Sequence, residues 1–323
     1  MKFKIGDIEI ANGTVLAPMA GVTDVSFRKL CSRYGASLTV SEMISAKGVY
    51  YKDKKTAALA ASFDGEHPYA VQIFGSDPEI MAIAAKELLS INPAIDIFDI
   101  NMGCPMPKIT GNGDGSSLMR DPMLAGEIVK AVSSATIAPV TVKMRTGWDS
   151  EHINAPKLAE ICQENGAKAI CVHGRTREQL YRPPVDTETI RNVKASVSVP
   201  VIANGGVYTA VDAVKLIEAT GCDGIAVGQG AMGNPFIFSE IAAAFQNEPF
   251  IAPVTDEMLK IASEHVRLLC IDKGEYIGVR EARKHLGWYI KGLPGAAEAR
   301  RSINSATTEA ELYEILSTLA RVN

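Results

Sequence analysis

The stretch Ile95-Asp-Ile-Phe-Asp-Ile-Asn-Met-Gly-Cys-Pro105 joins an apolar strand, predicted at residues 95–100, to a sharp turn that carries one thiol. Glycine and proline flank Cys104 and break regular structure, whereas Cys171 lies inside an apolar segment typical of a buried structural cysteine. Barrel enzymes place their chemistry at the carboxyl ends of their strands. We therefore interpret Cys104 as a functional thiol.

Short apolar runs of this kind recur along the chain at intervals that suit strand-plus-helix units. The eight runs span residues 14–17, 37–41, 69–73, 95–100, 140–144, 169–173, 201–204 and 224–228. Helices are predicted between them, from Asp24 to Gly35, from Asp77-Pro78 to Leu89 and from Pro122 to Val132. Eight alternating units predict a (β/α)8 TIM barrel.

The alternative architecture is an open doubly wound sheet. Such a sheet normally carries a glycine-rich dinucleotide turn after its first strand, with an acidic residue some twenty positions further on. The first strand here ends in Ala17-Pro-Met-Ala-Gly21, which lacks that pattern, so the barrel is favoured. Residues 1–10 alternate polar and apolar side chains and predict one small additional strand.

The character of the chain changes after the eighth strand. Residues 239–247 are predicted to be helical, and from about Pro253 only helix patterns remain, among them an apolar stripe over 258–269 that ends before Gly274. Thr308-Glu-Ala-Glu311 is a capping box that starts a last helix. We expect a barrel domain at 1–245 and a small C-terminal helical domain at 246–323.

Composition sets the broad class. The 323 residues are 47% hydrophobic and 22% charged, which is ordinary for a globular protein, and the net charge of −4 neither supports nor excludes an RNA partner. Six scattered cysteines without a CxxC pair argue against a metal site and against disulfides, and favour a reducing cytoplasm. No apolar run approaches the roughly 20 residues of a membrane span. We expect a monomeric cytoplasmic protein.

Polar side chains end several of the predicted strands. If Val142 and Met144 face the helices, Lys143 and Arg145 must point into the barrel mouth. A buried ammonium needs an anion or water, so the alternative for Lys143 is an internal ion pair with Asp99.

Five strand-end groups could surround the polar edge of one planar heterocycle: Gln72, Asn101, Lys143, His173 and Asn204. The turns Asn204-Gly-Gly206 and Gly228-Gln-Gly230 follow strands seven and eight, where barrels often bind phosphate through backbone N–H groups. The alternative is that these glycines only make tight turns. Together, the ring-sized constellation and the paired turns suggest flavin mononucleotide (FMN).

These residues belong to motifs that resemble the tRNA-dihydrouridine synthases, particularly the bacterial B-type branch. The matching motifs are Ala17-Pro-Met-Ala-Gly-Val-Thr-Asp24, Thr39-Val-Ser-Glu-Met43, Gln72-Ile-Phe-Gly75, Asn101-Met-Gly-Cys-Pro105, Lys143-Met-Arg-Thr-Gly-Trp148, His173-Gly-Arg-Thr-Arg177, Asn204-Gly205, Asn234-Pro-Phe-Ile-Phe238 and Arg283-Lys-His-Leu-Gly-Trp-Tyr289. They cover nearly the whole chain, and the Asn-Met-Gly-Cys-Pro turn is highly specific.

The resemblance implies reduction of uridine to 5,6-dihydrouridine in tRNA, with FMN recharged by NADPH or NADH that binds transiently. Cys104 would donate a proton to the uracil ring. FMN would contact Pro18, Met19, Ala20, Gln72, Lys143, His173, Asn204, Gly205, Gly206, Gly228 and Gln229. The RNA would contact Asn101, Arg145, Arg177, Arg283 and Lys284.

Three positions depart from the pattern of the family. The family commonly has an acidic residue in place of Gly206 and an arginine in place of Gln229, and loss of the arginine removes a charge-assisted phosphate contact. In Tyr181-Arg-Pro-Pro-Val-Asp186 the family usually has a glycine in a loop of small residues. Weaker FMN binding and an altered substrate loop are expected.

A basic cluster in the helical tail is the predicted RNA surface, made of Arg280, Arg283, Lys284, His285, Lys291, Arg300 and Arg301. A solvated helix face balanced by glutamates is the alternative. For the whole protein, the other hypotheses are an FMN barrel that reduces a small pyrimidine or enone, a non-catalytic RNA-binding descendant, and rRNA in place of tRNA as substrate.

Overall fold

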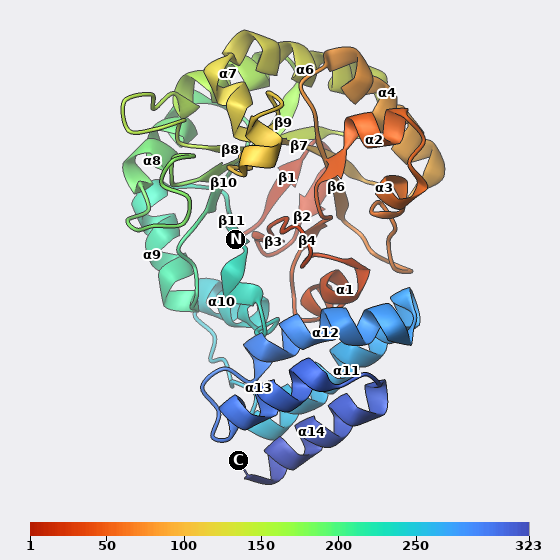
Figure 1. The fold of residues 1–323 in the computed structure, drawn as a ribbon. Coiled ribbons are helices and arrows are strands. Elements are labelled where there is room, and N and C mark those ends of the chain that lie inside the picture. Colours follow the sequence, from red (N-terminus) through yellow and green to blue (C-terminus); the bar gives the residue numbers. More distant parts are fainter. Residues whose placement is uncertain (323) are drawn as a thin grey trace.

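The computed structural model describes residues 1–322 and contains a closed barrel of parallel strands surrounded by helices (Figure 1). Eight strands pair in chain order around the ring, and pairing of the last with the first closes it. They are β3 (Thr14–Leu16), β4 (Leu38–Val40), β6 (Tyr69–Phe74), β7 (Ile97–Met102), β8 (Val140–Arg145), β9 (Ala167–His173), β10 (Val201–Asn204) and β11 (Gly224–Val227). The predicted TIM barrel and its eight strands are confirmed.

Helices connect the strands on the outside of the barrel. They are α1 (Val25–Arg33), α2 (Ala46–Tyr50), α3 (Lys54–Ala58), α4 (Pro78–Ile91), α5 (Pro107–Thr110), α6 (Pro122–Ala135), α7 (Ala155–Glu164), α8 (Thr187–Ser196), α9 (Ala210–Thr220) and α10 (Ile237–Gln246), with 3-10 turns η1 (Gly115–Arg120) and η2 (Gln229–Ala231). The predicted starts at Asp24 and Asp77 are confirmed, because each carboxylate accepts backbone N–H groups of the first helical turn.

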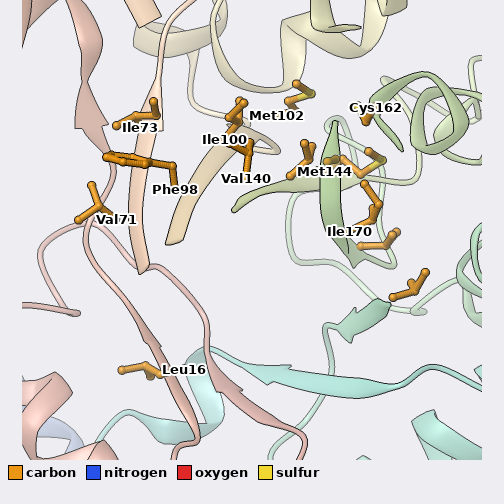
Figure 2. Packing of buried hydrophobic residues seen from close by; sticks show 14 of the residues in the cluster. Leu16, Val71, Ile73, Phe98, Ile100, Met102, Val140, Met144, Cys162 and Ile170 are labelled. Atoms are coloured by element: carbon orange, nitrogen blue, oxygen red, sulfur yellow. The ribbon is translucent and has the colours of Figure 1, made fainter. Parts of the chain in front are cut away.

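Alternation along the strands separates a helix-facing layer from the barrel interior. In β7, Phe98, Ile100 and Met102 lie in the apolar layer beneath the helices (Figure 2). Asp99 and Asn101 therefore point inward, since successive side chains of a strand face opposite sides. The strand runs two residues beyond the predicted end because β8 pairs with it as far as Met102. Asn101 is thus part of the strand rather than of the turn.

Residues 1–10 are extended as predicted, but they form two short strands instead of one. The structure has a hairpin of β1 (Phe3–Ile5) and β2 (Ile8–Ile10), which turns at Gly6 in the left-handed region with φ 59°. Ile5 and Ile10 are fully buried against interior residues of the barrel strands. The hairpin, at the centre of the ring in Figure 1, closes the amino-terminal end of the barrel and leaves the opposite end open for a site.

Four further helices form a separate core beside α1: α11 (Thr255–Lys273), α12 (Glu275–Tyr289), α13 (Ala296–Ser305) and α14 (Glu309–Val322). The predicted capping box is confirmed, because the Thr308 hydroxyl accepts from the Glu311 N–H while the Glu311 carboxylate accepts from the Thr308 N–H. Arg33 of α1 forms a bidentate ion pair with Glu264 of α11. In residues 1–322 no helix is long and apolar enough to cross a membrane.

Candidate active site

A cavity of about 380 Å³ opens at the carboxyl ends of the barrel strands. Cys104 lies on its wall, together with predicted residues from seven strand ends or the loops that follow them. The predicted residues in the lining are Pro18, Met19, Ala20, Gln72, Asn101, Cys104, Lys143, Arg145, His173, Asn204, Gly205, Gly206, Gly228 and Gln229. The structure therefore brings the predicted flavin constellation and the thiol into one space.

A chain of hydrogen bonds positions the Cys104 turn from below. The buried Asp99 carboxylate accepts from Thr141 Oγ1 and from Gln72 Nε2, each at 2.6 Å. Gln72 Oε1 in turn accepts from Asn101 Nδ2 at 2.7 Å. Asn101 Oδ1 then accepts the backbone N–H of Cys104 at 2.9 Å. Because each amide has its orientation set by the preceding group, the thiol turn is held in one conformation.

The Cys104 thiol is half-buried and protonated at neutral pH. Burial raises the pKa of the thiol above its ordinary value, while the Met106 N–H and the charges of Arg145 and Lys143 oppose part of that rise. A neutral thiol is a proton donor rather than a nucleophile. All six cysteines of the chain are free thiols.

Lys143 is part of the cavity wall. Its Nζ donates to Asn204 Oδ1 at 3.0 Å, and Asn204 Nδ2 donates to the Ala226 carbonyl. The alternative of an internal ion pair with Asp99 is wrong, because Gln72 and Thr141 occupy that carboxylate. Burial lowers the pKa of the Lys143 ammonium, and two of its three N–H donors are left for a ligand.

His173 is neutral in this cavity. Its pKa lies well below the ordinary value because of burial and of three neighbouring cations, Lys143, Arg145 and Arg175. Arg175 Nη1 lies 3.3 Å from His173 Nε2, so Nε2 is the acceptor and the ring proton resides on Nδ1.

Arg145 fastens two loops beside the thiol. Its Nε donates to the Gly103 carbonyl at 2.7 Å, and Nη1 donates to the carbonyls of Thr176 and Leu180. Burial lowers the pKa of the guanidinium to about 10, which leaves it charged at neutral pH. Arg145 thus ties the loop after β9 to the Cys104 turn.

The turn after β10 has the shape of a phosphate cradle. Gly205 and Gly206 have φ of 115° and 73°, and a Cβ on either would come within 2.9 Å of His173 or Val185. Neither backbone N–H of this pair has a partner among residues 1–322. Free N–H groups in a turn that excludes side chains fit an anion, so these residues fit the phosphate end of FMN. Gln229, in the neighbouring turn, accepts the Tyr208 hydroxyl at 2.9 Å.

Three predicted RNA-contacting residues lie outside the cavity. Arg177 packs over the Trp148 ring, 4.6 Å from its centroid. Arg283 is half-buried and donates to the Ala306 carbonyl inside the helical core. Lys284 is exposed and donates to the Gly21 carbonyl, which brings α12 to the rim of the barrel.

His285 does not belong to a basic surface, contrary to the prediction. It is 1% exposed, packs against Phe27 and His265, and has a pKa well below its ordinary value because of burial. The helical pattern alone did not show that this position of α12 faces α1.

Sequence reasoning missed three polar lining residues, Arg175, Tyr181 and Tyr208. Arg175 lies in the loop after β9, where the chain turns directly behind His173, because the Arg175 N–H donates to the His173 carbonyl at 2.7 Å. The strand period ends with β9, so no local signal distinguishes Arg175 from Arg177.

Comparison with known proteins agrees with the geometry of the site. The family model described as dihydrouridine synthase matches residues 15–322. A probable tRNA-dihydrouridine synthase from Rickettsia conorii is 43% identical over 303 residues, covering 93% of this chain and 91% of the relative. The tRNA-dihydrouridine synthase B of Shewanella oneidensis is 40% identical over 314 residues, covering 97% of both chains.

Two solved structures are similar in fold. Histamine dehydrogenase from Rhizobium sp. 4-9 superposes with a TM-score of 0.58 at 13% identity, over 83% of this chain and 50% of that one. A mutant of (S)-mandelate dehydrogenase gives 0.52 at 14% identity over 76% of each chain. From the family model and the relatives taken together, the chain belongs to the dihydrouridine synthase family.

Proposed function

We propose that this protein reduces specific uridines of tRNA to 5,6-dihydrouridine in a flavin-dependent reaction. One observation carries the proposal. The neutral Cys104 thiol shares one cavity with a ring-sized set of polar groups and with a glycine turn that fits a phosphate. The family and the names of the relatives support the same reaction class.

The residues of the cavity fit FMN as the cofactor. Gln72 and Lys143 would bind the polar edge of its ring, and the Pro18–Ala20 segment would lie along the ring. Gly205, Gly206, Gly228 and Gln229 would hold its phosphate. When bound, FMN supplies the hydride for uracil C6 after reduction by NADPH, which binds transiently.

Cys104 performs the proton transfer in this proposal. Its thiol donates a proton to uracil C5. General acid catalysis by a positioned side chain accelerates such a reaction about 10²- to 10⁴-fold. Asn101 holds the turn that aims the thiol, and Arg145 is placed at the same end of the cavity to meet the uridine. A stacked uracil cannot reach this depth, so the base must leave the stack before it reacts.

The helices of residues 246–323 are the proposed RNA-binding domain, and residues 1–245 the catalytic domain. Arg280 and Lys284 are exposed one turn apart on α12, and Lys284 contacts the barrel rim. Arg280 lies over the exposed Tyr276 ring, 3.5 Å from its centroid. A face that combines cations with an aromatic ring suits RNA, whose phosphates need the charge.

The test is incubation of the FMN-loaded protein with NADPH and an unmodified tRNA transcript, followed by mass spectrometry of nuclease fragments. The proposal expects one uridine to gain two hydrogens. Reduction of free uracil without RNA would favour the small-molecule hypothesis instead. Protein that shows no absorbance near about 450 nm after FMN is added and the unbound FMN is removed by gel filtration would exclude a flavin cofactor.

We further propose a monomer that works in the cytoplasm, where tRNA and NADPH are found and where six free thiols stay reduced. Parallel assays with rRNA fragments, and with NADH in place of NADPH, test the remaining choices of substrate and reductant.

A further inference from the structure

Three cations line the cavity without a carboxylate partner. They are Lys143, Arg145 and Arg175, and none of them forms an ion pair with an acidic side chain among residues 1–322. Asp99 lies one layer deeper and is occupied by neutral groups. Because burial of an uncompensated cation costs several kcal/mol, the cavity is built for anionic ligands.

The three cations are distributed along the cavity. Arg145 donates to the Gly103 carbonyl beside the thiol, and Lys143 donates to Asn204 Oδ1. Arg175 lies beside His173, because its Nη1 is 3.3 Å from His173 Nε2. A Cβ on Gly205 would lie 3.0 Å from that same nitrogen, so the Arg175 guanidinium borders the glycine turn.

Arg175 is only partly satisfied by the protein. It is 7% exposed, and its Nε donates to the Arg182 carbonyl at 2.9 Å. Its Nη2 donates to no acceptor among the described residues, so both Nη2 protons and one Nη1 proton are left for a ligand. Burial lowers the pKa of the guanidinium, and Tyr208 and Tyr181 oppose that shift.

Tyr208 and Gln229 complete this end of the cavity. The Tyr208 hydroxyl donates to Gln229 Oε1 at 2.9 Å and so links the loop after β10 to the turn after β11. Gln229 lines the cavity, and its Nε2 donates to no acceptor among the described residues, so its N–H donors are left for a ligand. These donors are neutral and do not compensate the charge of a phosphate.

We propose that Arg175 supplies the positive charge that binds the phosphate of FMN, with Tyr208 orienting Gln229 as a neutral donor beside it. The inference rests on the proposed function, because it presupposes FMN as the cofactor. A guanidinium edge binds phosphate through two charge-assisted hydrogen bonds. In this way Arg175 replaces the charge-assisted phosphate contact that the neutral Gln229 cannot make.

The experiment compares FMN with riboflavin, which lacks the phosphate, by quenching of flavin fluorescence on the flavin-free protein. Arg175→Gln is expected to weaken FMN about 10- to 100-fold, the range for a hydrogen bond between charged groups, and to leave riboflavin unchanged. Arg175→Lys should restore most of the preference for FMN. Tyr208→Phe should cause a smaller loss, also confined to FMN.

Arg182→Gln is the matched control, because this exposed neighbour contributes only its backbone carbonyl to Arg175. It should leave both affinities unchanged. Equal losses of FMN and riboflavin in Arg175→Gln would overturn the inference and give Arg175 a purely structural role, and unchanged FMN affinity would overturn it as well. A wild-type protein that binds neither flavin would refute the proposed function itself.

Discussion

At the scale of single residues, the state of the Cys104 thiol decides the chemistry. Burial raises its pKa, so the thiol keeps its proton at neutral pH. Cys104→Ala is expected to retain bound flavin and its reduction by NADPH, but to lower dihydrouridine formation about 10²- to 10⁴-fold. Single-turnover assays of the reduced enzyme with tRNA measure the loss directly. Unchanged turnover would remove Cys104 from the mechanism.

The same raised pKa predicts the pH profile of the reaction. A general acid acts while it is protonated, so the rate should fall as the pH rises through the pKa of the thiol. That fall should begin above the ordinary thiol value of about 8.5. Single-turnover rates between pH 6 and pH 10 test it, and a fall already complete by pH 7 would contradict a protonated thiol.

Lys143 should influence the flavin through its charge. A buried ammonium at the polar edge of the ring favours a negatively charged reduced cofactor. Lys143→Met is therefore expected to lower the reduction potential of the bound flavin. Lys143→Arg keeps the positive charge and should leave the potential close to that of the wild type. Equilibration with redox dyes measures the potential. Equal potentials in the methionine variant and the wild type would show that Lys143 does not act on the ring.

At the scale of elements, the contact of α1 with α11 and α12 contains two adjacent buried histidines. The rings of His265 and His285 lie 4.4 Å apart, and both pack against Phe27. Burial lowers the pKa of His265 to about 4, and that of His285 also lies well below its ordinary value. Protonation of either ring therefore opposes the folded state.

This contact predicts acid sensitivity of the fold. A group whose pKa is lowered by folding stabilises the protein above its unfolded pKa, so this stability is lost as the pH falls from about 6.5 towards 4. For His265 alone the loss reaches about 3 kcal/mol at pH 4. Thermal unfolding over this range should show a falling midpoint, with a shallower fall in His285→Leu. Identical slopes in the two proteins would refute the role of the pair.

Elements and site residues differ in how far the sequence predicts them. Strand periodicity and aspartate caps located the barrel strands and the starts of α1 and α4, because those signals are local. The hairpin turn at Gly6 and the burial of His285 depend on the elements against which these segments pack. A local sequence pattern carries no information about such partners. Arg175 lies beyond the end of β9, where the strand period no longer applies, and the hydrogen bond between Tyr208 and Gln229 joins two separate loops, so both needed the structure.

At the scale of the whole molecule, the helical domain should bind the body of the RNA while the barrel holds the flipped uridine. Arg280→Gln is expected to raise the KM for tRNA several-fold and to reduce the salt dependence of binding by about one ion. NADPH oxidation without RNA should not change. Lys260→Gln, which alters an exposed lysine of α11, is the control. Equal effects of the two substitutions would remove α12 from the RNA surface.

The most direct test of the account compares tRNA treated by the wild type and by Cys104→Ala, both loaded with FMN and supplied with NADPH. We expect mass spectrometry of the nuclease fragments to show one uridine that has gained two hydrogens with the wild type and almost none with the variant. A flavin-loaded, NADPH-reducible wild type that leaves every uridine unchanged would contradict the central claim.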